Sequence, residues 1–150
     1  MAIQPIPDGY HTVTPYLTIR NASDAIDFYR RAFGATELAR MADPTGKIAN
    51  AEIQIGSSRI LIRDETQETP GPEGLGGSPV MLHLYVEDVD HIADQAVAAG
   101  AKVLIPVGDQ FYGDRSGRFA DPFGHIWIIS THKEDVSSDE MRERASSFMT

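Results

Sequence analysis

Two histidines and two acids lie close together near the end of the chain, in the stretch GRFADPFGHIWIISTHKED (residues 117–135). They are His125, His132, Glu134 and Asp135. These residue types bind divalent metals or transfer protons. If the apolar run between the histidines is a strand, its rise of ~3.3 Å per residue places them roughly 23 Å apart. They therefore cannot share an ion, and the DPFG segment is expected to be a type I turn that leads into the strand.

A second pair of candidate catalytic residues is Glu52, in NAEIQI, and His83, in VMLHLYV. An imidazole and a carboxylate could bind a metal together, or act as a base and an orienting acid. In the structural alternative, the histidine bonds to a neighbour and the carboxylate pairs with an arginine, either Arg40, Arg63 or Arg118. The structural alternative is favoured, because isolated His and Glu residues are often structural.

The elements that must position these residues follow a repeated plan. VTPYLTIRNASDAIDFYRRAFGA starts at Val13, and VMLHLYVEDVDHIADQAVAAGA starts at Val80. In each, alternation of apolar and polar residues predicts a strand, and a helical spacing of apolar residues follows. Strand-like runs separated by turn residues come next. We therefore expect an α+β fold of two βαβββ modules, at about residues 10–65 and 79–132, in a single domain spanning residues 1–150.

Capping signals mark the ends of both predicted helices. Asn21 or Ser23 is expected to cap the first helix, and Gly34 to end it in the left-handed conformation. Asp88 or Asp90 is expected to cap the second helix.

The segments outside the modules carry weaker signals. Residues 64–79 are rich in Gly, Pro and acids, and are expected to be a linker that buries nothing. After the last strand, Ser137 and Glu140 match a capping box, which predicts a short C-terminal helix packed on the body or on a second subunit. Its apolar stripe consists of Met141, Ala145 and Phe148.

Strand alternation predicts which side chains face a ligand. A curved mixed sheet built from both modules, with helices on one face only, can enclose a cavity. Expected to face the helices are Val13, Leu17, Ile19, Val80, Leu82, Leu84 and Val86. Expected to line the cavity are Thr14, Tyr16, Thr18, Met81, His83 and Tyr85. Such a mixed lining favours a small organic ligand, although these side chains could instead fill a core.

The last strand and the loop before it complete the predicted site. Ile126 and Ile128 are expected to line the cavity, while His125 and Trp127 face the helices. In QFYGDRSG, Tyr112 and Arg115 could contact a ligand. A salt bridge from Arg115 to Asp114 or Asp121 is the alternative.

The repeated segments, together with NAEIQIG, AAGAKVLIPV, FYGDRSG and DPFGHIWIISTHKED, resemble the vicinal oxygen chelate superfamily. This superfamily includes glyoxalase I, bleomycin-resistance proteins and extradiol dioxygenases. FYGDRSG and DPFGHIWIISTHKED are similar to a bacterial branch likened to phosphonate-operon and demethylubiquinone-methyltransferase-like proteins. The resemblance implies paired βαβββ modules and a homodimer.

The resemblance also implies where a metal would bind. In metal-dependent members, His, Glu or Gln ligands stand on the first and last strands of each module. The matching positions are Thr14, Leu61, Met81 and Ile128. Because an alcohol, two hydrocarbons and a thioether replace a metal's hydration shell poorly, we expect no metal at the inherited site and no cofactor. A divalent metal at a non-standard site stays possible.

Composition narrows the function. The formal net charge of -9 disfavours nucleic acid, and the absence of cysteine excludes disulfides and thiolate ligands. No signal segment and no apolar stretch of ~20 residues is visible, so a cytoplasmic protein without a membrane partner is expected.

Three functions fit these observations. The favoured one is metal-free binding of a small organic molecule in the cavity, where Leu61 would also contact the ligand. The second is a lyase, isomerase or dioxygenase that uses Glu52 or His83 with a non-standard metal. The third is a structural or regulatory dimer without a ligand.

Overall fold

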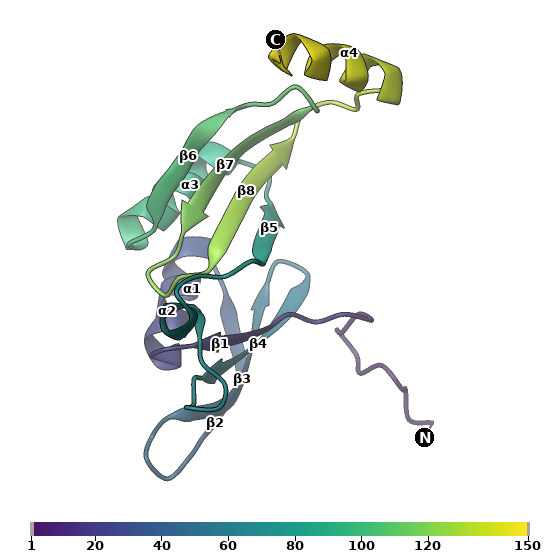
Figure 1. Ribbon diagram of the computed structural model, residues 1–150. Helices are drawn as coiled ribbons and strands as arrows, with labels where there is room; N and C mark the ends of the chain where they lie inside the picture. Colours follow the sequence, from purple (N-terminus) through teal and green to yellow (C-terminus); the bar gives the residue numbers. More distant parts are fainter. Residues whose placement is uncertain (1, 150) are drawn as a thin grey trace. The chain divides into compact units, whose positions relative to one another are not determined.

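The computed structural model describes residues 2–149 as two compact units. The first unit contains the chain up to Ser78 and the turn Pro122–Gly124. The second contains Pro79–Asp121 and the chain from His125 onward. Each unit holds one βαβββ module with a four-stranded mixed sheet, as the sequence predicts (Figure 1).

The first module consists of β1 (Tyr16–Ile19), α1 (Ala22–Phe33), β2 (Thr36–Ala42), β3 (Ile48–Ile55) and β4 (Ser58–Asp64). Its strand order is β1-β4-β3-β2, with β1 parallel to β4 and the other pairs antiparallel. The apolar stripe of α1 and the inward residues of the strands form the core, which includes Leu17, Ile19, Ile26, Phe28, Tyr29, Ile53 and Ile62.

The second module repeats this plan with β5 (Met81–Tyr85), α3 (Val89–Ala99), β6 (Lys102–Asp109), β7 (Asp114–Ala120) and β8 (Ile126–His132). Its strand order is β5-β8-β7-β6. One face of the sheet packs on α3, and the core between them includes Val89, Ala93, Ala96, Phe119, Trp127 and Ile129. We call the opposite face of this sheet the distal face.

The strand registers confirm the internal repeat. Leu17 on β1 pairs with Ile62 on β4, and Leu84 on β5 pairs with Ile129 on β8. Both first strands start later than the repeated sequence segments do, because β1 begins at Tyr16 and β5 at Met81. The prediction that Val13 and Val80 face the helices is therefore wrong, since both precede the strands and are 82% and 61% exposed.

The start of α1 is capped from another strand. Asn21 adopts the left-handed conformation (φ 63°) and its side chain makes no capping bond, so neither Asn21 nor Ser23 performs the predicted role. Instead, Asp64 at the end of β4 accepts from the backbone N–H of Ala22 at 2.8 Å and from that of Ile48 at 2.6 Å. Gly34 ends the helix at φ 70°, as expected.

The start of α3 has a matching arrangement. Asp88 is the capping residue and accepts from the backbone N–H of His91 at 3.2 Å. Thr131 on β8 accepts from the backbone N–H of Val89 at 2.9 Å and donates to the carbonyl of Val86 at 2.8 Å. Each module thus ties its helix to the end of its own last strand.

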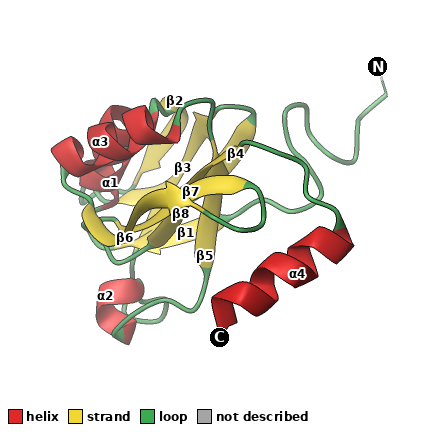
Figure 2. Cartoon of the chain, turned by 90° about the horizontal axis from the view of Figure 1, so that it is seen from above, coloured by secondary structure: helices red, strands yellow, loops and turns green. Residues whose placement is uncertain are grey.

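The segment between the modules is more ordered than predicted. It contains the short helix α2 (Pro72–Leu75), seen in Figure 2, and both Gly71 and Pro72 are buried. Glu65 accepts from Arg20 at 2.6 Å and from the backbone N–H of Gly71 at 2.9 Å. The expectation that residues 64–79 bury nothing is therefore wrong.

The C-terminal helix α4 (Ser138–Met149) lies past the end of β8 in Figure 1. Ser137 caps it by accepting from the backbone N–H of Glu140 at 3.1 Å. Arg144 fixes it to the second unit by donating to the carbonyl of Phe111 at 3.1 Å and to Glu134 at 2.7 Å. The predicted contact of Phe148 lies outside the described side chains. Across residues 2–149, no helix is both long and apolar enough to cross a membrane.

Candidate functional site

The distal face of the second sheet gathers polar and aromatic side chains from three neighbouring strands. On β5, Met81, His83 and Tyr85 are exposed while Leu82 and Leu84 are half-buried, as alternation predicts. The registers place further side chains beside them on β7 and β8, namely Asp114, Ser116, Arg118, Ile126, Ile128, Ser130 and His132. This face is the candidate functional site.

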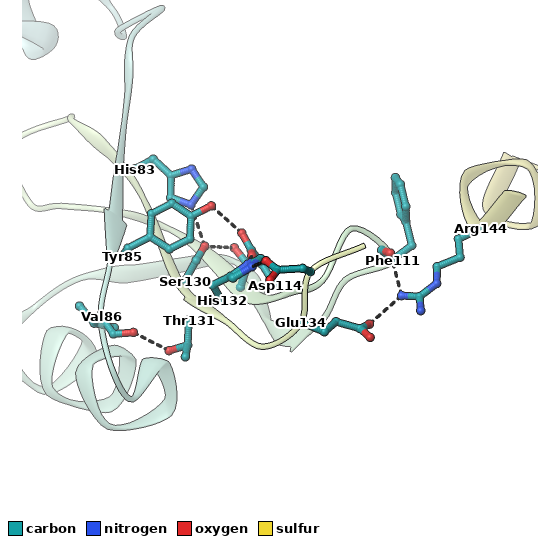
Figure 3. A network of polar contacts seen from close by, with 12 residues as sticks. His83, Tyr85, Val86, Phe111, Asp114, Ser130, Thr131, His132, Glu134 and Arg144 are labelled. Carbon is teal, nitrogen blue, oxygen red and sulfur yellow. Dashed lines mark hydrogen bonds and ion pairs between the residues drawn. The ribbon is translucent and has the colours of Figure 1, made fainter. Parts of the chain in front are cut away.

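A chain of hydrogen bonds runs across the middle of this face (Figure 3). His83 Nε2 is bonded to Ser130 Oγ at 2.8 Å, and Ser130 Oγ is bonded to Ser116 Oγ at 2.7 Å. The rings of His83 and Tyr85 stack with their centroids 4.5 Å apart. The imidazole is thus fixed in orientation by one hydrogen bond and one ring contact. Because Ser130 is fully buried, it orients His83 and cannot attack a substrate.

A second group of contacts surrounds Asp114, which is 4% exposed. Tyr85 donates to one carboxylate oxygen at 2.7 Å, and His132 Nδ1 lies 2.8 Å from the other. His132 Nε2 lies 2.7 Å from Asp135. Carboxylate oxygens only accept, so both contacts are hydrogen bonds at the same time only when both ring nitrogens of His132 carry protons. In that protonated state, His132 is a cation held between two acids.

The electrostatics agree with this geometry. The hydrogen bonds to Asp114 and then Asp135 raise the pKa of His132 above its usual value. Burial raises the pKa of Asp114, but the hydrogen bonds from His132 and Tyr85 outweigh burial and leave it below its usual value. The bond to Asp114, followed by burial, raises the pKa of Tyr85. The Tyr85 phenol thus stays protonated beside a carboxylate.

A hollow of about 160 Å³ opens on the same face. It is lined by Ile105, Gln110, Tyr112, Ser116, Gly117, Arg118 and Ile128. Two isoleucines provide apolar walls, and the remaining side chains offer hydrogen bonds and one positive charge. This combination of apolar walls with a few polar groups is typical of small-molecule sites.

The predicted catalytic residue Glu52 lies in the first unit and is occupied by other partners. It accepts from Tyr10 and from Arg59, each at 2.5 Å. The pairing predicted with Arg40, Arg63 or Arg118 is therefore wrong, because Arg59 lies beside Glu52 across the β3–β4 pair. The bond from Tyr10 and then that from Arg59 hold the pKa of Glu52 below its usual value, which makes it a weak base.

The other predicted ligand-binding residues of the first unit lie on its sheet or just before it. Leu61 pairs with both Tyr16 and Glu52 in the strand register. The Tyr16 hydroxyl donates to Asn50 at 2.9 Å, and Thr18 is half-buried on β1. Thr14 is half-buried and precedes β1.

Arg115 lies on the α3 side of its sheet, away from the distal face. Its guanidinium bonds to Asp90 on α3 at 2.8 Å and to Asp109 at 3.2 Å, so the predicted partners Asp114 and Asp121 are wrong. The cause is strand alternation, which directs Asp114 to the opposite face. Tyr112, by contrast, lines the hollow.

The histidines near the end of the chain lie at opposite ends of β8 and have different partners. His125 is buried beside the turn, where its backbone N–H donates to Asp121 at 3.0 Å. Trp127 Nε1 donates to the other oxygen of Asp121, also at 3.0 Å. His132 stands at the far end of β8 in the network around Asp114.

The side chains at the inherited metal positions do not fit a metal. Thr14, Leu61, Met81 and Ile128 offer one hydroxyl and one thioether between them, whereas proteins hold divalent ions mainly through carboxylate, carbonyl, imidazole or thiolate donors. Within residues 2–149, no group of three or more His, Asp or Glu side chains is arranged to hold an ion.

Several residues of the site were not predicted from the sequence. Asp114, Ser116 and Arg118 lie on β7, within a segment whose glycines and charges read partly as a loop. Ser130 lies within the largely apolar strand β8, so its polar role was not recognised from the sequence. The available signal was alternation, because once β7 is aligned with β8 these residues all point to one face.

The sequence of residues 10–129 matches the family model of the Glyoxalase/Bleomycin resistance protein/Dioxygenase superfamily. The chain belongs to this superfamily. An uncharacterized protein of Mycobacterium bovis is 40% identical over 140 residues, which cover 90% of this chain and 92% of that protein. The match to the family model thus extends over both modules.

Solved structures share the superfamily fold. Protein PA1353 of Pseudomonas aeruginosa aligns with a TM-score of 0.66 and 26% identity, over 83% of this chain and 99% of that one. A glyoxalase/bleomycin resistance protein/dioxygenase family enzyme of Burkholderia phytofirmans aligns with a TM-score of 0.61 and 22% identity, over 78% of this chain and 96% of that one.

Proposed function

We propose that this member of the superfamily binds a small organic molecule, without a metal, on the distal face of its second sheet. The supporting observation is that exposed His83 and Tyr85 are held in place by the buried groups Ser130 and Asp114. Side chains fixed in this way lose little conformational entropy when a ligand binds, which favours affinity.

The chemistry of the face supports binding over catalysis. Glu52 is neutralised by Arg59, and the Ser130 hydroxyl is buried, so neither is poised as a base or a nucleophile. The four positions at which the family resemblance places metal ligands offer only one hydroxyl and one thioether, which are weak ligands. The stacked rings of His83 and Tyr85 and the apolar side chains of Met81 and Ile128 instead suit the capture of a partly aromatic molecule.

The test is a thermal-shift screen of a small-molecule library, performed with and without EDTA. A ligand at a hundred times its Kd stabilises by about 2.7 kcal/mol, which raises the Tm by about 5–10 °C in a chain of this size. Tyr85→Ala should reduce the shift, whereas Val97→Ala, on the exposed side of α3, should preserve it. The proposal would be contradicted by ligands that bind only with added metal, or by ligands whose thermal shift is unchanged in Tyr85→Ala.

We also propose a homodimer. The edge strand β6 exposes an apolar run, in which Val103, Leu104 and Ile105 are 44%, 44% and 45% exposed. Proteins usually cover or charge such edges, since unpaired apolar strands associate. Sedimentation equilibrium should give twice the chain mass, and Leu104→Lys should shift the protein toward the monomer. A wild-type protein that sediments as a monomer would refute the homodimer.

A further inference from the structure

Arg118 is unusual among the arginines of this acidic chain, which carries 22 acids against 13 bases. Its Nε is buried without a hydrogen-bond partner, and no acid among residues 2–149 forms an ion pair with it. Most other arginines are paired with acids; on the same strand, Arg115 contacts both Asp90 and Asp109. A buried donor without a partner costs free energy, so the unpaired Nε of Arg118 lowers the stability of the folded protein.

The residues around Arg118 indicate which kind of ligand group would pair with it. The side chain lines the hollow on the distal face, and none of the residues that line this hollow is acidic. Tyr112 adds a hydroxyl that, within the described part of the chain, has no hydrogen-bond partner. The wall therefore offers one fixed cation and further polar groups, but no countercharge.

The apolar part of the wall indicates what kind of body the ligand has. Ile105 and Ile128 give the hollow an apolar side. Its volume of about 160 Å³ is close to that of apolar cavities that accept benzene. A ligand there would have a small apolar body and one anionic end.

We propose that the hollow binds a small organic carboxylate, whose two oxygens accept from the Arg118 guanidinium while its apolar part contacts Ile105 and Ile128. This inference rests on the proposed function and specifies its ligand class. Arginine matches a carboxylate because its planar fork donates two parallel hydrogen bonds. The bound carboxylate supplies the acid partner that Arg118 lacks among residues 2–149.

The test compares acids with uncharged amides of the same shape. Benzoate and benzamide, and hexanoate and hexanamide, are titrated into the full-length protein, and backbone amide shifts are followed by NMR. We expect the acids to bind about tenfold to a hundredfold more tightly than the amides, because hydrogen bonds to charged groups are the stronger ones. The shifts should cluster at the residues that line the hollow.

Three variants assign the preference to Arg118. Arg118→Gln should abolish the difference between acid and amide, and Arg118→Lys should keep part of it, since lysine is a point charge without the fork. Arg115→Gln removes the same charge from the same strand but on the α3 side, so it should keep the full preference. A change in Arg115→Gln as large as that in Arg118→Gln would overturn the inference as a general charge effect.

The outcomes also separate this inference from the function on which it rests. If the amides bind as tightly as the acids, or if only the amides bind, the hollow takes a neutral ligand and only the carboxylate assignment fails. If neither acids nor amides bind, the carboxylate assignment fails, and binding on the distal face is then judged by the library screen.

Discussion

Replacing Asp114 by asparagine removes the centre of the network on the distal face. The carboxylate is 4% exposed and accepts from Tyr85 at 2.7 Å and from His132 at 2.8 Å. Asparagine keeps one acceptor oxygen and places an amide where the second oxygen was. One of the two charged hydrogen bonds is therefore lost, at about 1.5–3 kcal/mol.

The size of this loss depends on pH in a defined direction. The pKa of His132 is raised in the folded state, so its contribution is complete below the unfolded value of about 6.5 and disappears as pH rises through the folded value. The pKa of Asp114 is lowered, so its contribution is present above the unfolded value of about 3.9 and disappears as pH falls through the folded value. The pair should stabilise the fold most between about pH 4 and pH 6.5.

The assay is urea denaturation of wild type and Asp114→Asn at several pH values, followed by circular dichroism. Near pH 5.5 the variant should lose about 1.5–3 kcal/mol of unfolding free energy, or about 4–10 °C in Tm. The difference should shrink at pH 9. An NMR titration should show the His132 midpoint falling in the variant.

Tyr85→Phe is the matched control, because it removes one hydrogen bond to Asp114 but keeps the contact with His132. It should cost about 1.5–3 kcal/mol, because the bond is made to a charged group, and this cost should be the same at pH 5.5 and pH 9. A His132 midpoint that does not move in Asp114→Asn, or an equal loss of stability at pH 5.5 and pH 9, would refute the proposed pairing.

Two further variants test the contacts inside each module. Asp64→Ala leaves the backbone N–H groups of Ala22 and Ile48 without partners and should lower the free energy of unfolding by about 2–4 kcal/mol in urea denaturation. Asp64→Asn should lower it less. A loss under about 1 kcal/mol in Asp64→Ala would contradict this capping role. Asp121→Ala removes the acceptor for Trp127 Nε1 and should cost a similar amount while changing the fluorescence of the chain's one tryptophan, whereas unchanged emission would show that the bond is not made in solution.

The fold was predictable from the sequence because its signals are local and repeated. Alternation gave the faces of β5 correctly, and the shared plan of strand and helix gave both modules. Errors arose where a partner comes from elsewhere in the chain. Asp64 caps α1 from the end of β4, and no residue next to Asn21 reveals this contact.

The candidate site was predicted only in part, for a related reason. His83 and Tyr85 follow from the alternation of a single strand, whereas their partners Ser130 and Asp114 depend on the register of three strands. Arg118 was considered only as a partner for an acid. Its significance lies in having none among residues 2–149, which a sequence cannot show.

The most direct test of metal-free binding is a calorimetric titration of the best library ligand into chelator-treated protein and into protein supplied with Zn²⁺, Ni²⁺ or Fe²⁺. Metal content is measured on the same samples. We expect the same Kd in all samples and substoichiometric metal, because the inherited positions offer only weak ligands, one hydroxyl and one thioether. One tightly held divalent ion per chain, with ligand binding lost on its removal, would contradict the account.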